Sequence, residues 1–237
     1  MKKKVIIFLI VIIIIIGIVI GIKLIKDNNY KKTDAYKFKT EYEKLNGELS
    51  KSGKKYRELN IPKNNKMVYS TAKEIVNKID NNETFVVYFG FSACPWCRSM
   101  VNNLIDLSIK NNVDVYYVDV LDIRDTLEIV DGEVKTTKEG NKYYMELLDR
   151  LDLVLSDYSL TDEEGKKIET NEKRIYAPNV VTVVNGLPEK MTEGISEDLK
   201  DPYGTITKQM KTDSIEQLKC IVKCLEKAAV CTKQSSC

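Results

Sequence analysis

An apolar run that ends in two closely spaced cysteines constrains the fold of this chain more than any other feature. Residues 85–89 are β-branched or aromatic, Cys94 and Cys97 follow, and an amphipathic segment begins at once. This order predicts a buried strand that delivers a Cys-x-x-Cys pair to the first turn of a helix. The partial positive charge and unpaired N–H groups at a helix N-terminus favour a thiolate. The pattern therefore indicates a dithiol that can cycle with a disulfide.

The residues of the motif have distinct expected roles. Cys94 precedes the helix and is expected to attack a substrate disulfide. In the oxidised protein, a substrate thiolate is expected to attack Cys94 instead. Either route gives a mixed disulfide, which Cys97 or the substrate then resolves. Pro95 suits the first helical position, and Trp96 is expected to cover the dithiol and offer substrates a flat apolar surface. Zinc binding is the alternative, but it normally takes two such cysteine pairs.

Composition removes several functional classes. The chain has no histidine, which excludes a histidine general base, a Cys–His nucleophile and any metal site that includes histidine. Its net charge is +2, and basic and acidic residues alternate along the sequence, so we expect an ordinary solvated surface and no nucleic-acid partner. We expect no metal, and no cofactor other than the redox-active disulfide itself.

Residues 1–26 predict a signal anchor in the cell membrane. Three lysines precede residues 5–22, which carry no charge and would span roughly 27 Å as a helix, close to the thickness of the hydrocarbon core. No small-x-small site follows the apolar run, so we expect an uncleaved single-pass helix; a signal peptide cleaved at an unobvious site is the alternative. The leading lysines and the six cysteines favour a domain outside the membrane.

Beyond the anchor, residues 27–66 are rich in Lys, Asn, Glu and Tyr and predict a stalk or spacer, and residues 67–237 predict one α/β domain. Helices are expected over 71–79, 95–110, 143–155 and 214–229, and strands over 85–89, 113–120, 180–184 and 189–195. The strand–helix–strand order after residue 85 predicts parallel strands. Asn185-Gly186 predicts a hairpin, and two further hairpin-like stretches turn at Asp131-Gly132 and Glu164-Gly165. The sheet should carry helices on both faces.

This order, with Cys-x-x-Cys after the first core strand and a proline before the third, resembles the thioredoxin superfamily over residues 71–120 and 176–229. The region 121–176 resembles an insertion. In detail the chain is most similar to membrane-anchored extracytoplasmic thioredoxin-like proteins of Gram-positive bacteria, including those called bacteriocin transport accessory proteins. The resemblance implies that Cys94 is the exposed nucleophile and Cys97 the buried resolving cysteine. It also implies that Pro178 is a cis-proline facing the dithiol and Ala177 its substrate-contacting neighbour.

One position departs from the family pattern. Thioredoxins place a buried acid six residues before the first cysteine, and this chain has Tyr88 there. A phenol with a reference pKa near 10 accepts protons poorly at neutral pH, so Tyr88 is expected to be core. Proton transfer would then fall to water or to Glu83, and the kinetics of a thioredoxin-like reductase are not expected.

Four further cysteines lie on and after the last predicted helix, in the tail 220–237. They are Cys220, Cys224, Cys231 and Cys237. They allow three pairings, between which the sequence does not choose. We expect two structural disulfides that pin the tail, nested as Cys224–Cys231 and Cys220–Cys237, because an exported domain favours disulfides. A tetrathiolate zinc site and a second redox centre are the alternatives.

These features together predict a membrane-tethered thiol–disulfide oxidoreductase that acts on exported proteins or peptides. Oxidase or isomerase activity is favoured over reductase activity, with a redox partner in the membrane that recharges the dithiol. The alternative is a non-catalytic binding module of the same fold that serves a transporter or a cell-wall partner. A peroxidase-like thiol enzyme is disfavoured, because such enzymes usually carry Thr or Ser where Cys94 stands.

Overall fold

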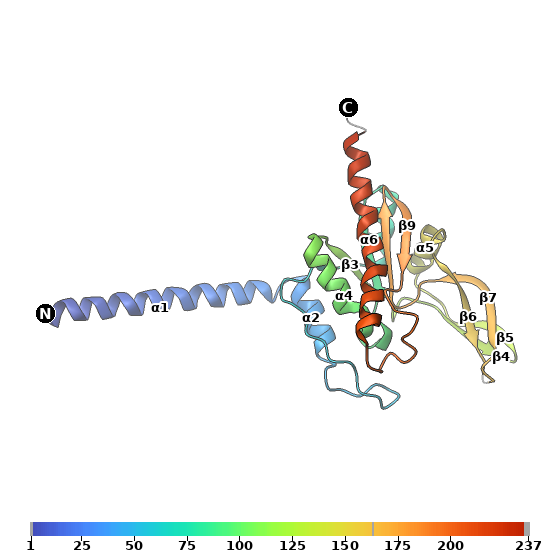
Figure 1. The fold of residues 1–237 in the computed structure, drawn as a ribbon, viewed down its shortest axis with the longest axis horizontal. Helices are drawn as coiled ribbons and strands as arrows, with labels where there is room; N and C mark the ends of the chain where they lie inside the picture. The colour runs from blue at the N-terminus through green and yellow to red at the C-terminus, as the bar shows by residue number, and fades with distance from the viewer. Residues whose placement is uncertain (1, 163, 235–237) are drawn as a thin grey trace.

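The computed structural model describes residues 2–162 and 164–234, and within helices the side chains of 2–7, 9–14 and 226–234 lie outside that description. Helix α1 (Lys2–Tyr30) projects away from the body of the molecule (Figure 1). Among the helices of the described ranges, none combines the length and the apolarity that a membrane span requires. The uncharged run of the predicted anchor, residues 5–22, lies on α1, and half of its side chains lie outside the description.

A five-stranded mixed sheet in the order β1-β3-β2-β8-β9 forms the centre of the body. Its strands are β1 (Met67–Tyr69), β2 (Phe85–Gly90), β3 (Val115–Asp119), β8 (Asn179–Val184) and β9 (Leu187–Thr192). Strands β1 and β2 both run parallel to β3, whereas β8 is antiparallel to β2 and to β9. The parallel strand–helix–strand unit and the Asn185-Gly186 hairpin are therefore confirmed. All six residues of β2 are buried, as expected for a central strand covered on both faces.

Helices cover both faces of the sheet, which confirms the α/β class. One face carries α2 (Asp34–Glu43), α4 (Pro95–Asn111) and α6 (Lys208–Gln234), and the other carries α3 (Ala72–Asp80) and α5 (Lys142–Leu151). Alternate residues of β2 enter the two cores, so that Tyr88 faces α2 and α4 whereas Phe89 faces α3 and α5. Helix α3 begins with a capping box between Thr71 and Glu74, which satisfies N–H groups at its first turn.

The prediction of a stalk over 27–66 is wrong from residue 34 onward. Phe38 and Tyr42 on α2 are completely buried, and the following loop adds Leu59 and Ile61 to the same core. Phe38 and Tyr42 are four residues apart and so share one face of α2, where their rings stack at 4.4 Å between centroids. The abundance of Lys and Glu concealed this narrow apolar face. The folded domain therefore begins near Asp34 rather than at Met67.

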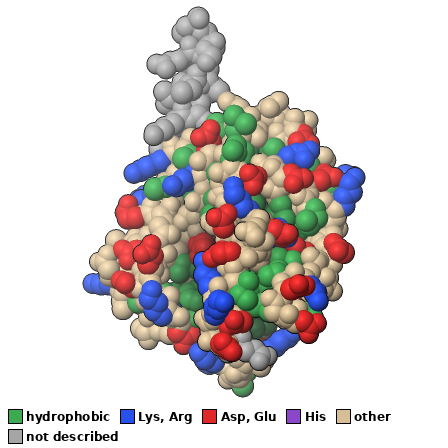
Figure 2. Space-filling model, turned by 90° about the vertical axis from the view of Figure 1, so that its right-hand side faces the viewer, with side chains coloured by type: hydrophobic (Ala, Val, Ile, Leu, Met, Phe, Trp, Pro, Cys, Tyr) green, Lys and Arg blue, Asp and Glu red, His purple; other side chains and the backbone are tan. Residues whose placement is uncertain are grey.

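The insertion forms two hairpins around α5. Strands β4 (Thr126–Val130) and β5 (Glu133–Lys138) form the first, and β6 (Ser156–Thr161) and β7 (Lys167–Arg174) form the second, which confirms both predicted turns. Figure 1 shows the two hairpins on the side of the body opposite α1. On the face shown in Figure 2, acidic and basic side chains are interspersed with apolar ones, in agreement with the alternating charges of the sequence.

Candidate active site

The two cysteines of the motif meet at the first turn of α4. Cys94 is the N-cap residue, and its Sγ accepts a hydrogen bond of 3.3 Å from the backbone N–H of Cys97. Pro95 occupies the start of the helix, where a missing N–H leaves no helical hydrogen bond unmade. Both thiols are free in this structure, with Cys97 completely buried and 4% of Cys94 exposed. The predicted strand-to-helix placement of the dithiol is therefore observed, but Cys94 is buried and not exposed as the resemblance implied, because it packs against Ala177 and the core under α4.

The environment separates the acidities of the two thiols. Hydrogen bonding from the Cys97 thiol lowers the pKa of Cys94, whereas burial raises it. Two further influences lower this pKa: the backbone N–H groups of Cys97 and Trp96, and the positive charge of Arg124. Burial raises the pKa of Cys97 well above that of an ordinary thiol, and the neighbouring Cys94 raises it further. Cys94 is thus suited to attack as a thiolate, while Cys97 holds its proton.

The chain segment before β8 closes the site from the side opposite α4. The Ala177–Pro178 peptide bond is cis, as the resemblance implied. The Cys94 thiol donates a hydrogen bond of 3.2 Å to the carbonyl oxygen of Ala177. Trp96, on the first turn of α4, is half-buried and packs against the same core as Ala177. The structure thus brings the predicted substrate-contacting residues to the dithiol.

Tyr88 lies beneath the dithiol and is completely buried, which confirms it as core. Its hydroxyl oxygen is 2.9 Å from that of Tyr42, and hydrogen bonding with Tyr88 lowers the pKa of Cys97 against the effect of burial. Gly90 makes room for this ring, since a Cβ at residue 90 would lie 2.4 Å from the Tyr88 hydroxyl oxygen. The sequence indicated a core tyrosine, but it did not indicate that the hydroxyl acts on Cys97.

Glu83 does not serve the dithiol, contrary to one of the expectations for proton transfer. It precedes β2, whereas the dithiol follows the other end of that strand, roughly 20 Å away at the rise of an extended chain. Its Oε2 pairs with Nζ of Lys78 at 2.7 Å.

Arg98, the residue after Cys97, is a charged residue of the site region that is buried, with only 1% of it exposed. Its guanidinium donates hydrogen bonds to the carbonyl oxygens of Tyr42, Ser92 and Arg57 and to Oδ1 of Asn46. No carboxylate pairs with it among the described side chains. Nothing beside Arg98 in the sequence signals this burial, because the residues that cover it come from the distant segment 42–57.

The insertion adds a wall beside the dithiol. A cavity of about 290 Å³ next to Ala177 is lined from the insertion by residues that include Arg124, Tyr144, Tyr158 and Tyr176. The Arg124 guanidinium lies 5.4 Å from the centroid of the Phe91 ring, which brings its charge to the dithiol. Arg124 is a site residue that sequence reasoning missed, because only the folded insertion places it there.

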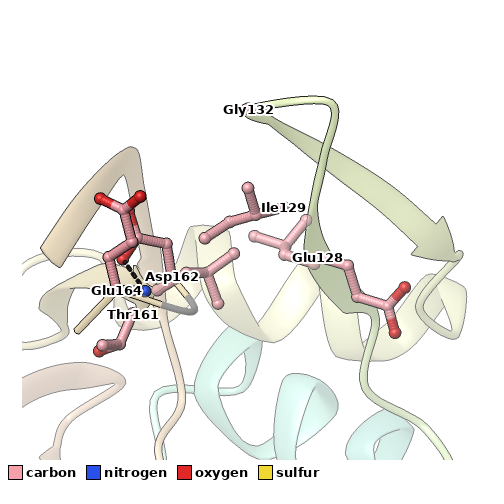
Figure 3. Close-up of a pocket in the computed structure, with 8 residues that line it drawn as sticks. Glu128, Ile129, Gly132, Thr161, Asp162 and Glu164 are labelled. Atoms are coloured by element: carbon pink, nitrogen blue, oxygen red, sulfur yellow. Dashed lines mark hydrogen bonds between the residues drawn. The ribbon is translucent and has the colours of Figure 1, made fainter. Parts of the chain in front are cut away.

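A second hollow, of about 560 Å³, opens between the two hairpins (Figure 3). Ile129 points across it toward the hairpin that carries Thr161 and Asp162, whereas Glu128 points away. Leu127 lines both this hollow and the cavity beside Ala177. Leu127 therefore lies between the hollow and the cavity that borders Ala177.

The C-terminal cysteines lie on or beyond α6, which is longer than predicted. Cys220 is exposed, Cys224 is partly buried, and both thiols are free. The predicted Cys224–Cys231 disulfide does not fit a continuous helix, because seven residues of helix separate Cα atoms by roughly 10 Å, beyond the limit of about 7 Å for a disulfide. Cys237 lies outside the described residues, as does the side chain of Cys231, so the Cys220–Cys237 pairing stays a prediction. Among the described residues, no group of three or more Cys, Asp or Glu is placed to hold a metal ion.

The functional assignment of this chain depends on the geometry of the dithiol and its surroundings. No protein-family model matches the sequence, and no curated protein matches it either.

Proposed function

We propose that this protein is a thiol–disulfide oxidoreductase of the thioredoxin superfamily, acting on exported proteins or peptides through Cys94 and Cys97. The observation that carries the proposal is the placement of the two thiols: Cys94 caps α4 and accepts the backbone N–H of Cys97, whereas Cys97 is completely buried. The pKa of Cys94 is lowered at the helix N-terminus, and the pKa of buried Cys97 is raised. A nucleophile and a resolving thiol need this division of acidity. The order of strands and the cis Ala177–Pro178 bond beside Cys94 support a thioredoxin-like fold.

The reaction can be written with these residues alone. The Cys94 thiolate attacks one sulfur of a substrate disulfide, and the other substrate sulfur leaves as a thiolate. Cys97 then loses its proton and attacks Sγ of Cys94, so that the mixed disulfide breaks and the Cys94–Cys97 disulfide forms. Two electrons pass from the protein to the substrate in this direction. The reverse sequence oxidises a substrate dithiol and leaves Cys94 and Cys97 reduced.

The electrostatics favour the oxidising direction. Hydrogen bonding from Cys97 and the charge of Arg124 stabilise the Cys94 thiolate, and therefore the reduced form of the pair. A pair whose reduced form is stabilised is a stronger oxidant. We therefore propose oxidase or isomerase activity, with a membrane redox partner that withdraws electrons from the reduced dithiol.

A substrate chain would lie against Ala177 and Trp96. The cavity lined by Arg124 and Tyr158 adjoins Ala177 and offers a cationic and aromatic surface to side chains next to the substrate cysteine. The insertion would therefore contribute to the choice of substrate.

We also propose that α1 tethers this domain to the outer face of the cell membrane. The apolar run with its flanking lysines supports this proposal. Large apolar side chains that are described on α1 are about half exposed or more, including Phe8, Ile16 and Leu24. Such a surface needs an apolar environment around it.

The test is oxidative refolding of a reduced, unfolded ribonuclease by the full chain in a glutathione buffer, followed by the return of ribonuclease activity. Wild type should accelerate refolding, and Cys94→Ser should abolish the acceleration. Cys97→Ser should accumulate a mixed disulfide with the ribonuclease, visible on a non-reducing gel, because no internal thiol resolves it. Cys220→Ser serves as the control and should behave as wild type. Equal rates for wild type and Cys94→Ser would overturn the proposal.

The low exposure of Cys94 supports a second candidate, a non-catalytic binding module. Only 4% of Cys94 is accessible, and the hollow between the hairpins offers a separate surface for a partner. In such a module the two cysteines would form a static bond. Equilibration with glutathione distinguishes the candidates: a catalytic pair titrates between about −120 and −270 mV, whereas a static disulfide stays oxidised down to about −300 mV.

A further inference from the structure

A chain of buried hydroxyl groups leads away from Cys97. Tyr88 and Cys97 are completely buried in the same core, and Tyr88 lowers the pKa of the Cys97 thiol against the effect of burial. The Tyr88 hydroxyl is 2.9 Å from that of Tyr42. The Tyr42 ring packs edge-on against that of Tyr117 with 6.1 Å between centroids, and the Tyr117 hydroxyl donates to Oε1 of Glu41 at 3.1 Å. The three tyrosines are completely buried and come from β2, α2 and β3. The chain therefore connects the resolving thiol to a carboxylate on a different element.

Glu41 gives this chain an outlet to solvent. It is only partly buried, and it lines a surface cavity of about 450 Å³ that is large enough for several water molecules. Its other carboxylate oxygen accepts a hydrogen bond from Tyr69. The titratable and charged groups around this carboxylate are Asp34, Lys37, Tyr69, Lys73, Tyr117 and Asp119.

The tyrosines are unsuited to hold a charge themselves. Burial raises the pKa of Tyr42 and of Tyr88 well above that of an exposed phenol, and it also raises the pKa of Tyr117. A neutral hydroxyl, however, donates one hydrogen bond while it accepts another. A row of hydroxyls can therefore pass a proton along without any member becoming ionised.

We propose that Tyr88, Tyr42 and Tyr117 relay the proton of Cys97 to Glu41 when Cys97 attacks the mixed disulfide. The proposal rests on the oxidoreductase function proposed above. The Cys97 proton passes to the Tyr88 oxygen, each hydroxyl hands on its own proton, and the Tyr117 proton reaches the Glu41 carboxylate. The electron pair left on Cys97 Sγ forms the bond to Cys94 Sγ. The bond from Cys94 to the substrate sulfur breaks, and the substrate leaves as a thiolate.

This arrangement accounts for a tyrosine where thioredoxins carry an acid. A carboxylate at residue 88 would be completely buried beneath the dithiol, which costs several kcal/mol in an apolar environment. Here the proton acceptor lies on α2, where water reaches it through the cavity. Tyr88 touches the reacting thiol, whereas Glu41 acts through the hydroxyls between them.

The single tryptophan of the chain makes the step measurable. Trp96 adjoins Cys97, so its fluorescence should report closure of the Cys94–Cys97 disulfide without interference from the C-terminal cysteines. Mixing the reduced full chain with oxidised glutathione in a stopped-flow instrument should give two phases. The first depends on glutathione concentration and reports attack by Cys94. The second is independent of that concentration and reports attack by Cys97.

Glu41→Gln and Tyr88→Phe should slow the second phase by tenfold or more and leave the first phase unchanged. General acid–base assistance contributes about 10²–10⁴-fold in enzymes, so tenfold is a conservative threshold. In wild type the second rate should be nearly flat between about pH 6 and pH 8. In both variants it should rise with pH, because hydroxide then removes the Cys97 proton. Tyr116→Phe, the neighbouring tyrosine outside the chain of hydroxyls, is the control and should match wild type.

The possible outcomes separate the relay from the function on which it rests. Wild type that forms no Cys94–Cys97 disulfide with glutathione would contradict the oxidoreductase function itself. If the Cys94–Cys97 disulfide forms at the wild-type rate in Tyr88→Phe and in Glu41→Gln, the relay is overturned, but the oxidoreductase function is not. If the second phase of both variants is slower by the same factor at every pH, the relay is also overturned, because such a result indicates displaced thiols rather than a lost proton path. If Tyr88→Phe lacks the first phase and has not folded, the partly exposed Glu41→Gln variant decides.

Discussion

Arg98 Nε donates a hydrogen bond of 3.0 Å to the backbone carbonyl oxygen of Arg57, and this contact joins α4, which carries the dithiol, to the loop after α2. The same guanidinium reaches the carbonyl oxygen of Tyr42 at 2.8 Å and Oδ1 of Asn46 at 2.8 Å. Carbonyl and amide dipoles thus surround a buried cation at the first turn of α4. Arg98 therefore fixes the position of α2 relative to Cys97.

Substituting Arg98 should destabilise the fold strongly. Arg98→Met leaves buried carbonyl oxygens without donors, and we expect the free energy of unfolding to fall by about 3–5 kcal/mol. Urea denaturation of the reduced protein measures this change. Arg150→Met is the control: Arg150 forms an exposed ion pair with Asp80, and its loss should cost at most about 1 kcal/mol. Equal effects of the two substitutions would contradict a structural role for Arg98.

Removing the charge of Arg124 should make Cys94 less reactive at neutral pH. Arg124 is one of the groups that lower the pKa of Cys94, so Arg124→Gln should raise that pKa and move thiolate formation to higher pH. Below the new pKa, the rate of alkylation of Cys94 by iodoacetamide should fall by roughly twofold to tenfold, since one pKa unit corresponds to tenfold. Mass spectrometry across a pH series measures the rate. Lys135→Gln, on β5, is the control, and its pH dependence of Cys94 alkylation should match that of wild type.

Adding a methyl group at Gly90 should displace Tyr88. The new Cβ would lie 2.4 Å from the hydroxyl oxygen and 2.5 Å from Cζ of Tyr88, and both are inside van der Waals contact. We expect Gly90→Ala to lower the free energy of unfolding by about 1–3 kcal/mol. In a Tyr88→Leu background the ring is gone, so the same substitution should cost less. A double-mutant cycle from urea denaturation tests this; strictly additive costs would exclude a clash between residues 90 and 88.

Truncation should locate the start of the domain. A chain that begins at Lys32 keeps α2 and should unfold cooperatively with an intact near-ultraviolet spectrum. A chain that begins at Met67 loses Phe38, Tyr42, Leu59 and Ile61 from the core. Each large apolar side chain removed from a core costs about 2–5 kcal/mol, so this shorter chain should not fold. Cooperative unfolding of residues 67–237 would show that the earlier segment is dispensable.

Local signals in the sequence were sufficient for much of the sheet and its helices. The buried run of β2, the proline at the start of α4 and the Asn185-Gly186 turn each act over a few neighbouring residues, and the structure contains all three elements. Cys94 and Cys97 were found in the same way, since a strand followed by a helix fixes where the two thiols lie.

Contacts between distant residues were not accessible to the same reasoning. Tyr42 meets Tyr88 across 46 positions of the chain, and Arg98 meets Asn46 across 52. Nothing beside Tyr42 or Arg98 in the sequence identifies the other partner. The buried guanidinium, the row of tyrosines and the charge of Arg124 beside Cys94 all result from tertiary packing, and for this reason sequence reasoning missed them.

The short connection between α1 and α2 limits how far the domain that carries Cys94 and Cys97 can move from α1. Only residues 31–33 separate the two helices, a length of about 10 Å when extended. A free spacer of the predicted length would have allowed the domain to search a wide volume. If α1 is held in a membrane as we propose, the short connection would keep the dithiol at a nearly fixed height above that surface, and substrates would have to arrive within that narrow layer to be oxidised.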